Sequence, residues 1–394
     1  MEVSRPEILL ISRFNNDFER NVATADFIDQ FYPCTLFHEF AIERIPNQLM
    51  HRFLKGCRFK LIDFSHLSIL ERIHNACNRA AREFSSNRFW RLGQWFKSKA
   101  RNKLKEAIHN FLDSHQFKVL VMTPTPRSSQ FPFLCEIYDY FRERGLPVLI
   151  LNHGVWIQWD RSYDLPDDSL VGEYLLYSCP FHREHVVDPQ QFKEHILTGD
   201  PRLSLPFMNR LMELVDYEKG KNKLGIYLPS SIQEDEDFQD VVLENLKLLE
   251  SESEWDEIKI LCHPNSTPTE FIKKVDKISD AKCHWRAENS LQLLMELDTV
   301  ITPPSTIVFE AMILDKKILI LDIFDGETMA KNYLDFGIPV ILPEELKDYD
   351  LDSLPKSYNE PALIENAWGN CEGKDGRVEI QRLLDRILKD CVKS

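Results

Sequence analysis

Several features that would narrow the class of this protein are scarce or missing in its sequence. The nine cysteines include no C-x-x-C pair, and their odd number is typical of reduced thiols rather than of a disulfide scaffold. The apolar run Ile8–Ile11 is far shorter than the ~20 residues of a membrane span, and we expect no signal peptide. Acidic residues outnumber basic ones by 63 to 48, which argues against a general nucleic-acid binder. We therefore expect a cytoplasmic protein that binds no nucleic acid.

What the sequence does contain is typical of a globular protein with more than one domain. Its 394 residues are 43% apolar and 28% charged, and at ~150 residues per domain this length indicates two or three domains. Short apolar segments alternate with helical ones in both halves, which predicts parallel sheets. The expected strands are 7–11, 34–37, 118–122 and 148–151 in the first half, and 258–262, 298–302, 317–321 and one beginning at Leu224 in the second.

This alternation predicts an α/β fold with two Rossmann-like domains that face each other across a cleft. The polar, Lys- and Gly-rich stretch after the first set of strands is the expected crossing between them. The expected division is 1–204 for the first domain, 205–222 for the crossing, 223–373 for the second domain and 374–394 for a C-terminal helix.

Polar residues follow two of the expected strands in the second half. His263 and Pro264 come after strand 258–262, where a histidine can donate to a phosphate or act as a general acid. The turn 302–306, Thr-Pro-Pro-Ser-Thr, follows the next strand. Prolines suit the first turn of a helix, so the backbone N–H groups of Ser305 and Thr306 stay free and form an anion cradle together with their hydroxyls.

Glu310 lies one helical turn beyond Thr306, where a carboxylate can accept hydrogen bonds from ribose or base hydroxyls. Two plainer interpretations stay open. His263 can be a turn histidine that bonds a neighbouring carbonyl, and the Ser305 turn can be an ordinary helix cap with Glu310 on the surface. Since ligands bind at the carboxyl ends of strands in open α/β sheets, we favour a nucleotide-phosphate site.

The region 224–325, with its strand ending in His-Pro and its Pro/Ser/Thr turn before a helix with Glu, resembles the second domain of GT-B-type glycosyltransferases. It is most similar to bacterial enzymes of surface polysaccharides, namely CMP-sugar transferases for sialic acid or Kdo and the related glycerophosphotransferases. The resemblance implies that His263, Pro264, Ser305 and Thr306 hold the donor nucleotide and its phosphate.

The activity implied is glycosyl transfer from a nucleotide sugar, with a CMP-activated acidic sugar preferred, in surface polysaccharide or lipopolysaccharide biosynthesis. The acceptor would be a glycan or a lipid-linked glycan, and neither a metal nor a cofactor is expected. The segment TGDPRLS, residues 198–204, is similar to hydrolysing UDP-sugar 2-epimerases, which share the two-domain shape. A UDP-sugar 2-epimerase-like enzyme and a non-catalytic nucleotide- or carbohydrate-binding GT-B scaffold are therefore the alternatives.

The catalytic base is less well defined by the sequence. The acidic pair followed by Gly, usual in the sialyltransferase branch, has no good match in the first half. His153 and Asp160, after strand 148–151, are candidates to deprotonate an acceptor hydroxyl. Asp235 is a further candidate, with Ser230 and Ser231 touching donor phosphate. The acidic run at Asp235 is equally typical of the first turn of a helix.

One segment departs from the acidic background. Residues 72–105 contain ten Lys or Arg and a single acid, Glu83, with Phe84, Phe89, Trp90, Trp95 and Phe96 among them. This composition suits an anionic membrane surface, which would make the protein peripheral to the inner membrane. The alternative is a solvated helix pair whose aromatic side chains belong to the core.

Overall fold

The computed structural model describes most of the chain, and the statements below concern that part. The described residues are 6–12, 15–38, 48–63, 76–77, 79–80, 83, 87–123, 125–126, 132–151, 169–170, 172–177, 192–215, 222–229, 236–252, 255–262, 269–284, 290–305, 307–323, 333–334, 336–355, 358 and 376–393.

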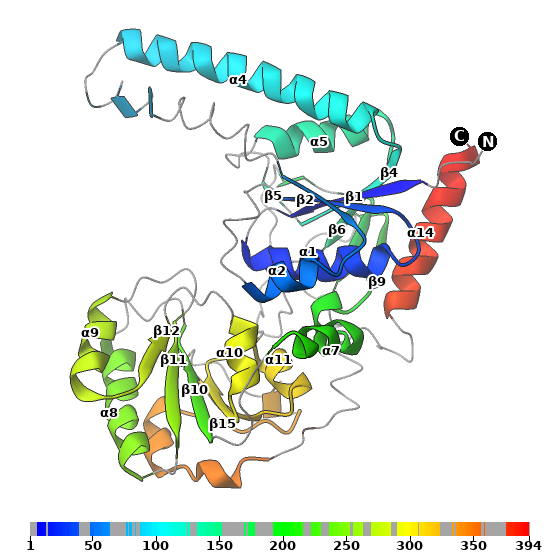
Figure 1. The fold of residues 1–394 in the computed structure, drawn as a ribbon. Helices are drawn as coiled ribbons and strands as arrows, with labels where there is room; N and C mark the ends of the chain where they lie inside the picture. Colours follow the sequence, from blue (N-terminus) through cyan, green and yellow to red (C-terminus); the bar gives the residue numbers. More distant parts are fainter. Residues whose placement is uncertain are drawn as a thin grey trace.

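The first domain is built on a seven-stranded sheet in the order β3-β2-β1-β4-β6-β8-β9, in which every neighbouring pair is parallel (Figure 1). Its central strands are continuous apolar runs, typical of strands covered on both faces. The strands are β1 (Glu7–Ser12), β2 (Cys34–His38), β3 (Lys60–Asp63), β4 (Phe117–Met122), β6 (Val148–Leu151), β8 (Tyr174–Tyr177) and β9 (Glu194–Leu197). A two-residue antiparallel pair, β5 (Thr125–Pro126) with β7 (Ser169–Leu170), stands apart.

Helices cover both faces of this sheet because successive side chains of a strand point to opposite sides. Ile8 and Leu10 of β1 join the cluster that contains α1 (Asn15–Ile28), α2 (Gln48–Leu54) and α7 (Leu205–Glu213). Leu9 and Ile11 pack with α4 (Asn87–Asp113) and α5 (Pro132–Glu143) on the other face.

The second domain has a six-stranded sheet in the order β12-β11-β10-β13-β14-β15, again parallel throughout. Its elements are β10 (Lys223–Tyr227), α8 (Glu236–Glu252), β11 (Glu257–Leu261), α9 (Thr269–Ile278), β12 (Lys282–His284), α10 (Ser290–Glu296), β13 (Thr299–Thr302), α11 (Ile307–Ile313), β14 (Lys317–Leu321), β15 (Val340–Ile341) and the 3-10 helices η6 (Pro343–Asp348) and η7 (Leu351–Ser353). The expected α/β class with two parallel sheets is confirmed.

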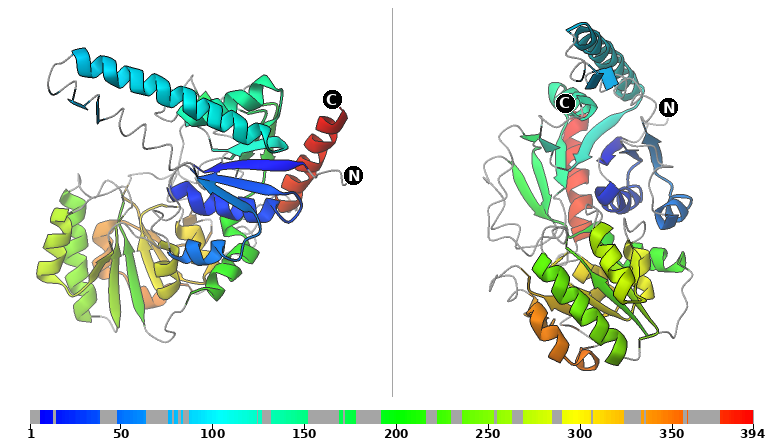
Figure 2. Two further views of the ribbon diagram at one scale, coloured as in Figure 1. Left: turned by 45° about the horizontal axis from the view of Figure 1, so that its top comes forward. Right: turned by 90° about the vertical axis from the view of Figure 1, so that its left-hand side faces the viewer.

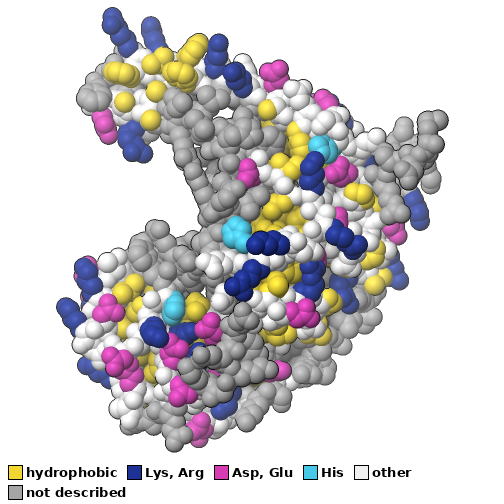
Figure 3. Space-filling view, in the orientation of Figure 1, with side chains coloured by type: hydrophobic (Ala, Val, Ile, Leu, Met, Phe, Trp, Pro, Cys, Tyr) yellow, Lys and Arg dark blue, Asp and Glu magenta, His cyan; other side chains and the backbone are white. Residues whose placement is uncertain are grey.

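The two domains share part of their core. The face of the second sheet that carries α10 and α11 belongs to the same apolar cluster as α1, α2 and α7, and includes Val300 and Val308. Helices α8 and α9 cover the opposite face with a separate cluster. Figure 2 shows the second domain below the first in both views, and the space-filling view is hollowed between the outer part of α4 and the second domain (Figure 3).

The last helix, α14 (Gly376–Lys393), returns to the first domain and packs on β9 and β4. Asp385 accepts a hydrogen bond from the hydroxyl of Tyr32, and Arg386 pairs with Glu194. A Cβ at Gly376 would lie 2.2 Å from the carbonyl oxygen of Thr198, so α14 begins directly against the segment that follows β9.

Candidate functional site

The segment that follows β9 forms a tight turn at the junction of the domains. Gly199 has a φ of 68°, the left-handed region that favours glycine. Asp200 then caps the 3-10 helix η4 (Pro201–Leu203) by accepting a hydrogen bond from the backbone N–H of Arg202 at 3.0 Å. This cap places a buried carboxylate and an arginine side chain beside the second domain.

Asp200 is surrounded by two guanidinium groups. Arg202 donates to it from Nη2 at 2.9 Å, and Arg20 of α1 donates at 3.4 Å. Burial alone would raise the pKa of the Asp200 carboxyl, but the two arginines outweigh it and hold that pKa well below its usual range. Asp200 is therefore ionised and fixes both arginines. We refer to Arg20, Asp200 and Arg202 as the arginine cluster.

Glu310 brings the second domain into this cluster. It sits in the first turn of α11, and its Oε1 lies 3.8 Å from Nη1 of Arg202. Its exposed fraction is only 8%, so the interpretation of Glu310 as a surface residue is wrong. Burial raises the pKa of the Glu310 carboxyl to about 7, with Arg202 opposing this and Glu19 and Asp200 adding to it. Burial prevails because the contact is long and Arg202 is already committed to Asp200.

The turn between β13 and α11 is closed by its own hydroxyl groups. The Thr302 hydroxyl donates to the carbonyl of Pro303 at 2.9 Å, and the Oγ atoms of Thr302 and Ser305 are 3.2 Å apart. Since the Thr302 proton is already used, the Ser305 hydroxyl is the donor in the second contact. Donation to a phosphate would thus require the Ser305 hydroxyl to rotate. Helix α11 has only seven residues, so its dipole contributes less than that of a long helix.

Tyr227 adds a polar group on the neighbouring strand. It ends β10, which pairs with β13 in the sheet. Burial raises the pKa of the Tyr227 hydroxyl well above its ordinary value, and the negative charge of Glu310 contributes in the same direction. The hydroxyl therefore stays protonated.

Of the site residues predicted from the sequence, the structure describes Ser305 and Glu310, and it places both on the segment after β13. Helices and strands next to some of the other predicted site residues are described: β6 ends at Leu151, α8 begins at Glu236, and β11 leads into the buried Cys262. The predicted residues that lie outside the described part are His153, Asp160, Ser230, Ser231, Asp235, His263, Pro264 and Thr306.

The sequence interpretation assigned no role to Arg20, Asp200 or Arg202. One signal was available: Gly-Asp-Pro directly after a strand predicts a capped helical turn, in which the Asp side chain is fixed. The partner Arg20 lies 180 residues away along the chain, and no local pattern indicates it.

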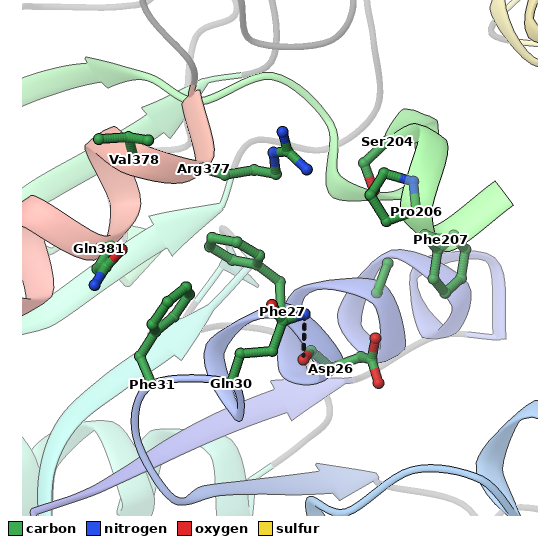
Figure 4. A pocket seen from close by; sticks show the side chains of 11 residues that line it. Asp26, Phe27, Gln30, Phe31, Ser204, Pro206, Phe207, Arg377, Val378 and Gln381 are labelled. Carbon is green, nitrogen blue, oxygen red and sulfur yellow. Dashed lines mark hydrogen bonds between the residues drawn. The ribbon is translucent and has the colours of Figure 1, made fainter. Parts of the chain in front are cut away.

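A pocket elsewhere in the described part lies between α1, α7 and α14 (Figure 4). Phe27 of α1 and Gln30 of the turn after it face Val378 and Gln381 of α14 across the pocket, which contains none of the predicted site residues. Asp26 at its edge pairs with Arg210 at 2.6 Å.

Comparison with known proteins identifies the fold of this chain. No family model matches the sequence, and no curated protein matches it either. S. aureus MnaA, solved with UDP, superposes with a TM-score of 0.59 at 11% identity, covering 98% of this chain and 97% of that one. The UDP-GlcNAc 2-epimerase of Methanocaldococcus jannaschii gives 0.58 at 12%, covering 96% and 99%. The wall teichoic acid polymerase TagF gives 0.52 at 11%, covering 99% and 90%.

Identities this low show the fold alone. The chain has two Rossmann-like domains arranged as in GT-B-type proteins, as the sequence predicted.

Proposed function

We propose that this protein is an enzyme that binds a UDP-sugar at the carboxyl ends of the second sheet and acts on the sugar. The observation that carries the proposal is Glu310, a buried carboxylate in the first turn of α11, the helix that follows β13, and in contact with Arg202 of the other domain. A carboxylate in this place suits the ribose hydroxyls of a nucleotide, since ligands of open α/β sheets bind at strand ends. Ser305, Thr306, Ser230, Ser231, His263 and Pro264 remain the proposed contacts to the phosphates.

Uridine replaces cytidine as the proposed nucleotide. The support comes from the similar structures, which include the Methanocaldococcus jannaschii epimerase in complex with UDP-GlcNAc and UDP, and MnaA with UDP. The CMP-linked sugar expected from the sequence has no comparable support among them.

The first candidate reaction is epimerisation of a UDP-sugar of the 2-epimerase type. Inversion at a carbon that carries hydrogen needs acidic and basic groups around one sugar and no acceptor. The arginine cluster, Glu310 and Glu19 gather acids and arginines at the junction of the domains. His153, Asp160, Asp235 and His263 remain the proposed proton-transfer groups.

The second candidate is transfer of the sugar to a glycan or lipid-linked acceptor. It is favoured by the similarity to TagF, a wall teichoic acid polymerase, and by the exposed aromatic part of α4. The two candidates share the nucleotide site and differ in whether a second substrate is needed.

Calorimetry with UDP, CMP and CDP tests the nucleotide site. We expect UDP to bind most tightly and Glu310→Gln to weaken it by roughly 10- to 100-fold, because a hydrogen bond to a charged group contributes about 1.5–3 kcal/mol. Glu344→Gln, an exposed glutamate of η6, is the matched control and should bind as the parent does. The proposal fails if none of the three nucleotides binds, or if both variants bind equally well.

NMR of UDP-GlcNAc with the protein then separates the two reactions. Inversion at C2 in the absence of an acceptor supports the epimerase, whereas release of UDP that depends on an added glycan acceptor supports the transferase.

A further inference from the structure

Helix α4 consists of two parts with different surroundings. Toward its C-terminal end, Ile108 and Leu112 are fully buried, His109 packs edge-on against Tyr140 of α5, and α4 lies along α5. The N-terminal part extends beyond the body of the first domain as an arm (Figures 1 and 2). We call residues 87–99 the α4 arm.

The α4 arm exposes large apolar side chains. Trp90 is 55% exposed, Trp95 51%, Phe89 46% and Leu92 44%. Phe89, Leu92 and Trp95 are three residues apart, so they form a row along one side of the helix, and Trp90 flanks it. The interpretation that these aromatics belong to the core is therefore wrong for Phe89, Trp90 and Trp95. A cluster of this kind is rare on soluble surfaces and marks an interaction site.

Basic residues border this row and acids are absent from it. Arg88 and Arg91 precede Leu92 and Trp95 by four residues, which places each on the same side of the helix as its partner. The ammonium group of Lys99 lies 4.9 Å from the centre of the Trp95 ring. No Asp or Glu occurs anywhere in residues 84–105, although the chain as a whole is strongly acidic.

We propose that the α4 arm docks on an anionic lipid bilayer, lying in the plane of the headgroups. Phe89, Leu92 and Trp95 would enter the boundary of the acyl chains, where Trp is favoured, while Arg88, Arg91 and Lys99 reach the lipid phosphates. Charge complementarity selects this partner: an acidic protein is repelled by an anionic membrane except where a basic stretch faces it. No helix in the described part of the chain is long and apolar enough to cross a membrane.

Co-sedimentation of the full-length protein with vesicles tests the proposal. We expect binding to phosphatidylcholine vesicles that contain phosphatidylglycerol and none to phosphatidylcholine alone. Raising the salt from about 0.1 M to about 1 M should weaken binding, because the Debye length falls from ~10 Å to ~3 Å. The proposal is overturned if the protein stays in the supernatant with the anionic vesicles at low salt.

Two variants assign the binding to the α4 arm. Each basic residue near an anionic surface contributes roughly fivefold in affinity, so R88E/R91E/K99E should lose more than about a hundredfold. The double variant L92S/W95S should lose the binding that persists at high salt. The matched controls reverse three exposed lysines elsewhere, K247E/K277E/K389E, and replace an exposed leucine of the second domain, L334S. The proposal is equally overturned if these controls weaken binding as much as the arm variants do.

The result is independent of the proposed function, because UDP binding in solution should be unchanged in all the arm variants. Circular dichroism verifies that they fold. Binding of the α4 arm to nucleic acid or to a protein, with no binding to vesicles, would also refute docking on lipid.

Discussion

Arg202 and Glu310 come from different domains and face each other with 3.8 Å between Nη1 and Oε1, both largely withdrawn from solvent. Arg202 also bonds Asp200, so one guanidinium contacts two carboxylates whose pKa values are shifted in opposite directions. The pKa of Asp200 lies well below its ordinary value, whereas burial raises the pKa of Glu310 to about 7. The junction between the domains thus contains one permanently charged acid and one acid that titrates near neutral pH.

The first prediction concerns stability and pH. Because the pKa of Glu310 is higher in the folded protein than its ordinary 4.5, its contribution is fully present at low pH and is lost as the pH rises through about 7. The unfolding free energy of the parent relative to Glu310→Gln should therefore fall by up to about 3 kcal/mol between about pH 4.5 and about pH 8. Urea unfolding of both proteins across this range measures it, and a pH-independent difference would contradict it.

The second prediction concerns the same group with ligand bound. Ribose hydroxyls donate best to an ionised carboxylate, so the affinity for UDP-GlcNAc should rise by about tenfold between about pH 6 and about pH 8 as Glu310 ionises. Glu310→Gln should flatten this dependence while lowering the affinity overall. Calorimetry of the two proteins side by side measures the effect. Parallel pH profiles would show that Glu310 does not touch the nucleotide.

How far the sequence predicted the fold depends on the kind of strand. The apolar segments 148–151 and 317–321 are β6 and β14 as predicted, because a fully buried strand must be apolar along its whole length. The strands that were missed are short, partly exposed or mixed in polarity, such as β15 with two residues and β12, Lys-Cys-His. Their pairing depends on neighbouring strands rather than on their own pattern.

The candidate site, like the fold, could be predicted from the sequence only in part. The position of Ser305 and Glu310 after β13 could be predicted, since strand ends and turn residues are local signals. The burial of Glu310 and its contact with Arg202 could not, because they arise only when the two domains pack together.

The third prediction concerns the arginine cluster. Asp200→Asn would remove the buried carboxylate that both Arg20 and Arg202 contact, and breaking a buried ion pair costs about 3–5 kcal/mol. We expect a marked fall in Tm by calorimetry. Glu270→Gln removes an acid that pairs with Lys273 on an exposed helix, and as a control it should leave Tm unchanged, because surface pairs contribute little. An equal change in Tm for Asp200→Asn and Glu270→Gln would show that the arginine cluster stabilises the protein no more than a surface ion pair does.

The fourth prediction concerns how α14 is anchored. A methyl group at residue 376 would lie 2.2 Å from the carbonyl oxygen and 2.4 Å from the carbonyl carbon of Thr198, and backbone atoms cannot move aside as a flexible side chain would. Gly376→Ala should therefore destabilise the protein by about 1–3 kcal/mol, the usual range for overpacking. Gly56→Ala is the matched control: its nearest contact would be 3.5 Å, and it should be neutral or slightly stabilising. Because Thr198 precedes the turn that fixes Asp200, the Gly376 variant should also weaken UDP binding, whereas the control should not. Stability and UDP affinity that match the parent would show that α14 is not held tightly against this turn.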